Sequence, residues 1–387
     1  MSLSYPEAQK KSEELKSFAK KNNDISLELE AEIYLAYYCI FHHIGTENER
    51  IDRMLEVEER GKEEKILDIE ARAVKVLQDY YWYDKKNYEI GFEYGLKLDK
   101  ILSRTNAKDF PDLPEYYHII GKCYYLFRDY PTAIKYFKKT LEVPENSFNW
   151  RSHWAAANTL GLCYRKLNKT DSSDYYLKQS LQSSFLTKDD IQYTISQGNI
   201  GFNLYQKGQF EEAETLFRED VSNAVKTQDY GLAAGSMIPL ADIYIYQGKM
   251  KEAAELLKKS ETYIRKSGQQ ERFEDFYPVI SRWYERNGNK EMSVKYRDSA
   301  IIASNENNNT FNGLVILRVQ QKIDRQKMEQ DEKNRKIKTS LFFLFLAIIS
   351  VFAVLYYFYQ KKIYKEKNKT KEAELRLSQE KLETAKI

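Results

Sequence analysis

The chain has 387 residues, which is enough for several ordinary domains or for one long repeat array. Its 61 Lys and Arg residues nearly balance its 58 Asp and Glu residues, and the net charge of only +3 argues against a dominant attraction to nucleic acid. Gly (15) and Pro (7) are scarce, aromatic residues reach 14%, and the sequence has no convincing alternating strand pattern, so the composition predicts an all-α fold.

The first predicted helix begins with a five-residue pattern that recurs twice later in the chain. The segment SYPEA at residues 4–8 parallels DYPTA at 129–133 and NYEIG at 87–91, with Pro in the first helical turn where it is tolerated. The chain therefore starts at the second helix of a hairpin, and an uncapped solenoid edge exposes apolar surface. We expect the N-terminus to be truncated relative to a longer gene product. Residues 1–11 lack the apolar core of a secretory signal.

The middle of the chain repeats at a constant spacing of 40 residues. Five segments with matching turns begin at Gly121, Gly161, Gly201, Ala241 and Ser281. A fixed period in this range is typical of a solenoid built from helical hairpins. Each unit would contain one helix before the turn, helix A, and one after it, helix B.

Four positions of each unit carry similar residues. The opening small residue is followed three positions later by Tyr124, Tyr164, Leu204, Tyr244 or Tyr284. Further along come small residues again, Ala133, Ser173, Ala213, Ala253 and Ser293, and then Phe137, Leu177, Phe217 and Leu257, with Arg297 breaking the pattern. Small residues are needed where helix A crosses helix B closely, and the large ones fill the space beside the crossing.

This order of small and aromatic residues resembles the tetratricopeptide repeat family, over about residues 115–300. The resemblance implies a right-handed superhelical solenoid, which we place at 1–304 with about seven hairpins, the first one incomplete. The chain departs from the family in its longer period and in the leading Trp position, which here holds Tyr117, Ala157, Gln197, Met237 and Tyr277.

The C-terminal part predicts a membrane anchor. Residues 341–359 carry no charge, and at 1.5 Å per residue they nearly match a hydrocarbon core of about 30 Å. We expect a stalk helix over 305–339, a transmembrane helix over 340–360, and a charged helix or coiled-coil start over 361–387. The alternative, a buried core helix, would need every face covered. Basic residues flank both ends nearly equally, so the positive-inside rule leaves the orientation open.

The family resemblance also predicts where a partner binds. In tetratricopeptide arrays the A helices line a concave surface that holds an extended or helical peptide. By position, the exposed A-helix residues here are His118, Lys122, Tyr125, Asn158, Arg165, Asn199, Phe202, Asp242 and Tyr246. The family's carboxylate-gripping positions hold His118, Asn158 and Gly198 instead of Lys, so we predict no such clamp. The alternative interpretation of these residues is ordinary solvated surface.

No residue pattern indicates catalysis, a cofactor or a metal site. Cys123 and Cys163 occupy one position in adjacent repeats, too far apart for a disulfide, and are expected to be small buried residues. His42 and His43 point about 100° apart on a helix and cannot share a metal. Known hydrolase and nucleotide-binding motifs are missing from the sequence. We therefore predict a protein that is not an enzyme.

The order of parts resembles bacterial membrane-bound repeat regulators. That resemblance implies repeats outside the inner membrane and a cytoplasmic output domain, which is absent from these residues. We predict a membrane-anchored interaction or sensor module, the sensory part of a bacterial transcriptional regulator or signalling protein. A cytosolic scaffold held to the membrane by its tail-proximal helix is the alternative. The stalk and C-terminal helix could also pair in a homodimer, and no direct contact with nucleic acid is expected.

Overall fold

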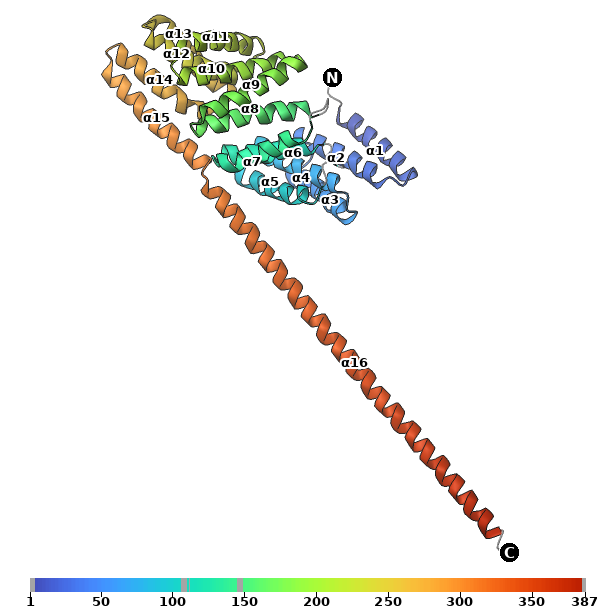
Figure 1. The fold of residues 1–387 in the computed structure, drawn as a ribbon. Coiled ribbons are helices and arrows are strands. Elements are labelled where there is room, and N and C mark those ends of the chain that lie inside the picture. The colour runs from blue at the N-terminus through green and yellow to red at the C-terminus, as the bar shows by residue number, and fades with distance from the viewer. Residues whose placement is uncertain (1–3, 106–109, 111, 145–148, 385–387) are drawn as a thin grey trace. The chain divides into compact units, whose positions relative to one another are not determined.

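The computed structural model describes residues 4–105, 110, 112–144 and 149–384. Within these ranges the chain is helical and contains no strand, as predicted (Figure 1). It divides into two compact units, Met1–Val319 and Gln320–Ile387, which are described separately below.

The first unit is a succession of helices joined by short turns. Their bounds are α1 Tyr5–Lys21, α2 Ile25–Phe41, α3 Glu47–Glu63, α4 Leu67–Asp79, the π-helical turn η1 Tyr80–Asp84, α5 Tyr88–Leu102, α6 Leu113–Leu126, α7 Tyr130–Glu142, α8 Trp150–Lys166, α9 Thr170–Thr187, α10 Asp190–Gln206, α11 Phe210–Lys226, α12 Tyr230–Tyr246, α13 Met250–Ser267, the 3₁₀ turn η2 Gln270–Arg272, α14 Phe273–Arg286 and α15 Lys290–Thr310. A last helix, α16 Leu314–Thr384, begins in this unit and continues through the second.

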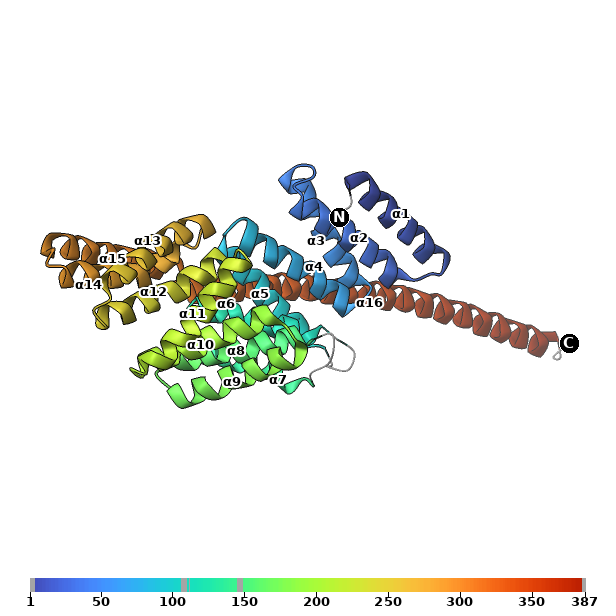
Figure 2. The same ribbon diagram turned by 90° about the horizontal axis from the view of Figure 1, so that it is seen from above.

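The helices pair into hairpins that stack in chain order (Figure 2). Consecutive helices contact each other from α1 to α6, and from α6 on the hairpins are α6–α7, α8–α9, α10–α11, α12–α13 and α14–α15. The predicted parallel between the helix starts is confirmed: α1 and α7 both begin at Tyr with Pro in the first turn, and Ala8 and Ala133 are fully buried. The array is thus a helical solenoid; its predicted handedness stays a prediction.

The crossing of each A and B helix depends on a small residue. Ala133, Ser173, Ala213, Ala253 and Ser293 are all fully buried. On the facing helix, a Cβ added at Gly161 would lie 2.5 Å from Leu177 Cγ, and one at Gly121 would lie 2.8 Å from the Phe137 ring. Any side chain at these two positions would force the helices apart, because packed interiors have no spare volume.

The aromatic position also has the same surroundings from repeat to repeat. Tyr124 stacks on Tyr136 with ring centroids 5.6 Å apart, and both the Tyr164–Tyr176 and the Tyr284–Tyr296 pairs stack at 5.4 Å. These pairs are separated along the chain by 40 and 120 residues. The prediction that residues one period apart share an environment is confirmed for these three repeats; in the other two the partner position holds Leu216 or Leu256, and the centre of the Tyr244 ring lies 5.0 Å from Lys249 Nζ.

The turns repeat with the same spacing. Arg128, Asn168, Gly208, Gly248 and Gly288 all have positive φ, between +56° and +76°, and end an A helix. A second series at Lys188, Gln228 and Gly268 ends the B helices. Upstream the series drifts, since Asn23, His43, Lys65 and Lys86 lie 20 to 22 residues apart. Left-handed residues stop a helix and reverse the chain, so they set the hairpin length.

The three cysteines are free and buried, as predicted for Cys123 and Cys163. Burial raises the pKa of the Cys123 and Cys163 thiols to about 12, so both stay protonated. Gln78 Nε2 lies 3.6 Å from Cys123 Sγ. These cysteines therefore act as small core residues.

The second unit consists of α16 alone. Among the described side chains of this helix only Val315, Ile316 and Val319 are buried, and all three lie in its first two turns, inside the first unit. Within the described residues one helical stretch is long and apolar enough to cross a membrane, judged by length and composition, and its apolar window is not buried. The predicted ends of the transmembrane helix, near 339 and 360, fall inside α16, so only the amino-acid composition defines them. Residues 385–387 of the predicted charged helix lie outside the described residues.

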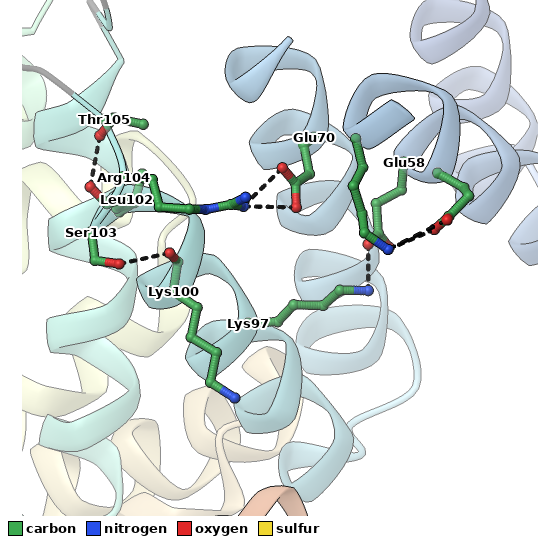
Figure 3. A network of polar contacts seen from close by, with 10 residues as sticks. Glu58, Glu70, Lys97, Lys100, Leu102, Ser103, Arg104 and Thr105 are labelled. Carbon is green, nitrogen blue, oxygen red and sulfur yellow. Dashed lines mark hydrogen bonds and ion pairs between the residues drawn. The ribbon is translucent and has the colours of Figure 1, made fainter. Parts of the chain in front are cut away.

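A polar network ties α5 to α3 and α4 (Figure 3). Glu58 on α3 and Glu70 on α4 are buried carboxylates with exposures of 4% and 5%. Lys97 pairs with Glu58, and Arg104 Nη2 donates to both oxygens of Glu70 at 2.9 Å. Lys100 extends away from both carboxylates in the same view. Because a buried carboxylate needs a partner, Lys97 fixes α5 against α3, and Arg104, just after α5, fixes the end of that helix against α4.

We expect Lys97→Met to lower the free energy of unfolding by about 1–3 kcal/mol, since it leaves Glu58 buried without its cation; the partial exposure of Lys97 keeps the loss below that of a fully buried pair. Lys100→Met, on the same helix, should change it by less than about 0.5 kcal/mol. Urea unfolding followed by tryptophan fluorescence measures both, because all four Trp residues lie in the array. Equal effects of the two substitutions would contradict the role of the pair.

Candidate functional site

One cavity lies between two parts of the array that are distant in the sequence. It has a volume of about 980 Å³. One wall comes from η1 and α6, with Trp82, Tyr83 and Lys122; the other comes from η2, α14 and α15, with Phe273, Ile302 and others. A second cavity of about 580 Å³ shares Leu126, Glu271, Asn307 and Phe311 with the first. We call these two joined cavities the inner groove.

The first cavity combines aromatic faces with cations. Its aromatic lining consists of Trp82, Tyr83, Tyr88, Phe273, Tyr277 and Phe311. Lys122 Nζ donates to the Tyr83 hydroxyl at 2.6 Å and lies 4.9 Å from the centre of that ring. The Arg265 guanidinium lies 5.1 Å from the Phe273 ring. Such a wall can hold an extended ligand that has both apolar and polar groups.

The second cavity contains charged groups that are recessed but open to water. It is lined by Tyr125, Lys166, Arg272 and Asp275, among others. Burial lowers the pKa of Arg272 and raises that of Asp275, and both shifts reflect the cost of charge in a recess. The opposite charges of Lys166, Arg272 and Arg165 limit the shift of Asp275.

Two of the nine predicted binding residues, Lys122 and Tyr125, line the inner groove. His118, one turn before Lys122, packs against the Phe137 ring with centroids 5.6 Å apart. Burial, assisted by the nearby Lys122 charge, lowers the pKa of His118 to about 4. His118 is therefore neutral at physiological pH.

Four further predicted residues form one polar cluster on α8 and α10. Asn199 Nδ2 donates to Asn158 Oδ1 at 2.9 Å, and Arg165 Nη1 donates to the Asn199 carbonyl at 3.1 Å. The Arg165 guanidinium also lies 5.0 Å from the Phe202 ring. Burial lowers the pKa of Arg165, while Tyr125 and Asp275 act in the opposite direction. Tyr125 and Asp275 line the inner groove, so Arg165 of this cluster interacts electrostatically with residues of the groove.

The last two predicted residues lie farther along the array, beside a cavity of about 320 Å³. Asp242 accepts hydrogen bonds from the Tyr205 hydroxyl and, at 2.8 Å, from Arg282 Nε. Tyr246 is 67% exposed and packs against Phe210. The nine residues therefore form three groups, and Asp242 already has two donors.

Sequence reasoning missed the far wall of the inner groove. That wall comes from the turn 268–272, α14 and the B helix α15, whereas only A-helix positions were considered. The far wall contacts the turn between α6 and α7: Arg128 lies 3.6 Å from Glu274 and also donates a hydrogen bond to Asn308. No periodic signal encodes such a contact, because it joins residues of different repeats at unrelated positions.

One buried carboxylate lies beneath α10 and α12. Asp220 is 1% exposed; it accepts a hydrogen bond from Ser236, and its Oδ1 has no partner. A Cβ added at Gly198 would lie 2.6 Å from its Oδ2. The equivalent positions in other repeats hold hydroxyls, Thr140, Ser180 and Ser260. Burial raises the pKa of Asp220 to about 6.

Asp220 should make the array less stable as the pH rises from about 4 to 6. The unfolded chain releases this proton near pH 4, whereas the folded chain keeps it until about pH 6. The free energy of unfolding therefore falls across this window and stays constant above it. We expect Asp220→Asn to stabilise the array by roughly 2–3 kcal/mol at pH 7.5 and by little at pH 4. Urea unfolding at both pH values measures this; a gain independent of pH would contradict it.

No family model and no curated protein sequence matches the chain. Solved structures do match: a Rap protein complexed with competence and sporulation factor (TM-score 0.53, 12% identity, 79% of this chain and 99% of that one) and NprR in complex with its cognate peptide NprX (0.52, 17%, 79% and 88%). A third is aspartyl phosphate phosphatase F from Bacillus subtilis (0.50, 13%, 78% and 89%). At these identities the likeness is one of fold. The resemblance to tetratricopeptide-type regulators is confirmed at that level.

Proposed function

We propose that this tetratricopeptide-type array binds a peptide or a protein segment in the inner groove and that α16 holds it to a membrane. The observation that carries the proposal is the groove itself, about 980 Å³ in its larger part and lined by aromatic rings, Lys122 and Arg265. NprR, of the same fold, was solved with its cognate peptide. The module would be the sensory part of a bacterial transcriptional regulator or signalling protein.

The proposed contacts use the groove lining and the polar cluster on α8 and α10; Asp242 and Tyr246, beside another cavity, are not among them. Aromatic faces would take apolar side chains, and Lys122 would lie near a carbonyl or carboxylate of the ligand. Asn158, which was predicted to be exposed, is buried and already accepts from Asn199 Nδ2, so Asn199 is the amide that would meet an extended backbone. Of the other predicted residues, Tyr125, Arg165 and Phe202 are the strongest candidates, because they lie next to the groove.

We also propose that the chain is not an enzyme. Among the described residues no group of three or more His, Cys, Asp or Glu could hold a metal ion. The inner groove carries carboxylates as well as cations, amides and phenols, and this mixture suits the binding of a ligand with both charges. The phosphatase among the structural neighbours shares the fold only, and fold alone does not carry catalysis.

Peptide binding can be tested with a sequence selected from a displayed peptide library against the full chain in detergent. We expect Lys122→Ala and Arg165→Ala each to weaken that peptide at least about tenfold, measured by fluorescence anisotropy, because hot-spot cations at a recessed site contribute more than about 1.4 kcal/mol. Arg151→Ala is the matched control, since Arg151 is an exposed cation on the same helix as Arg165. Affinity unchanged by both groove variants would reject this site.

The membrane proposal rests on residues 340–360. The large apolar side chains of this stretch, such as Phe343 and Phe352 at 64% and 67%, are exposed. Exposed apolar surface of this extent is unfavourable in water and favourable in a lipid core. The predicted stalk, 305–339, is not one helix, because α15 ends at Thr310 and α16 begins at Leu314; its part from 320 on would form a stalk, and 361–387 a charged helix able to pair in a homodimer. An array outside the bacterial inner membrane is preferred; a cytosolic scaffold is the alternative.

The anchor predicts that the chain stays in the membrane pellet after alkaline carbonate extraction. Replacing Ile349 and Phe352 by Arg should release it, since each Arg near the middle of a span costs about 2.5–3.5 kcal/mol. Lys336→Ala, outside the span, should not. Protease added to intact spheroplasts then separates the orientations: digestion of the array places it outside the inner membrane, and protection supports the cytosolic scaffold.

A further inference from the structure

The two walls of the inner groove are joined by a small set of contacts. The Phe311 ring lies 5.0 Å from Tyr88 and 6.3 Å from Phe127, centroid to centroid. Beside it, Arg128 Nη2 lies 3.6 Å from Glu274 Oε2, and Arg128 Nη1 donates to Asn308 Oδ1. We call these residues, Tyr88, Phe127, Arg128, Glu274, Asn308 and Phe311, the clasp. The clasp connects the early repeats to the end of the array.

The clasp is continuous with the start of α16. Only two residues, Asn312 and Gly313, separate Phe311 from Leu314, where that helix begins. A Cβ added at Gly313 would lie 3.8 Å from the Phe127 carbonyl, so the backbone here touches the clasp. Val315, Ile316 and Val319 follow with exposures of 6%, 7% and 0%. We call residues 314–319 the root of α16.

The clasp also forms part of the inner groove. Phe311 and Asn307 line both of its cavities, and Thr310 lines the larger one. Arg128 and Glu274 line the smaller one. A ligand in the groove therefore touches residues that hold the clasp shut, and the same residues lead directly into the root.

We infer that the width of the inner groove and the packing of the root of α16 change together, with the clasp as the element that couples them. Few side chains close the array, and the Arg128 ion pair is partly exposed, so opening the clasp costs far less than unfolding the repeats. A ligand that bridges the two walls would favour the closed clasp and keep the root packed. Because coupling between two sites is reciprocal, releasing the root must loosen the groove equally.

This inference deepens the proposed function by naming its regulation, and it can be tested without any peptide. Its first arm is hydrogen exchange of the full chain in detergent. We expect Arg128→Ala and Phe311→Leu to speed exchange of the backbone amides of 314–319 at least about fivefold and to leave α10 unchanged. Arg151→Ala and Phe185→Ala are the matched controls, since both residues are exposed and lie far from the clasp in the chain. Unchanged exchange at the root in both clasp variants would overturn the inference.

The second arm measures the reverse effect. Spin labels at Tyr83→Cys and Ser299→Cys, on opposite walls of the groove, report its width by electron–electron distance measurement. Adding Val319→Ala or Val319→Asp should broaden the distance distribution, because Val319 is fully buried in the root. The parent chain, whose three cysteines are buried, supplies the labelling background. If hydrogen exchange of the root rises while the distribution of spin-label distances stays unchanged, the coupling is overturned. Tryptophan fluorescence confirms that each variant is folded. Loss of peptide binding alone would reject the proposed function and leave this result standing.

Discussion

Each hairpin of the array hides its apolar side against the next, and that packing depends on the close crossing of two helices. At the crossing a backbone without a side chain, as at Gly121 and Gly161, meets a large residue of the facing helix. The large residue fills the space and is fully buried. Because the same contact recurs every 40 residues, stability along the array is a sum of similar neighbouring terms. The groove, the turns and the clasp all depend on this repeated geometry.

The parts of the fold that could be predicted are those encoded locally. Small and aromatic residues at fixed positions, such as Ala133 and Tyr124, reveal which residues meet inside a hairpin, since the hairpin brings together residues close in sequence. The same reasoning identified Lys122 and Arg165 as A-helix residues facing the groove side. Arg165, Asn199 and Phe202 were predicted only as separate positions, however, because their contacts with one another depend on how two neighbouring repeats are rotated against each other.

The parts that could not be predicted depend on the sum of many small rotations. The contact between Arg128 and Glu274 depends on the rotation between successive hairpins, summed over several repeats. A small error in the rotation expected for each repeat would move the two residues far apart. The far wall of the groove, including Phe273 and Ile302, follows from the same sum. Asp220 is a different case. The residues one period before and after it carry hydroxyls and are buried, so its burial could have been predicted from the sequence.

The π-helical turn η1 has a consequence for the near wall of the groove. Its wider ring, in which Lys85 N–H bonds the Tyr80 carbonyl at 3.0 Å, accommodates one extra residue without interrupting the helix. Side chains beyond such an insertion are rotated by about 100° from the register of an uninterrupted α-helix. Within this turn Trp82 is 4% exposed while its neighbour Tyr83 is 54% exposed, and both line the first cavity. The π-helical turn therefore places two aromatic side chains on one wall of the cavity, at a point where the regular helix ends.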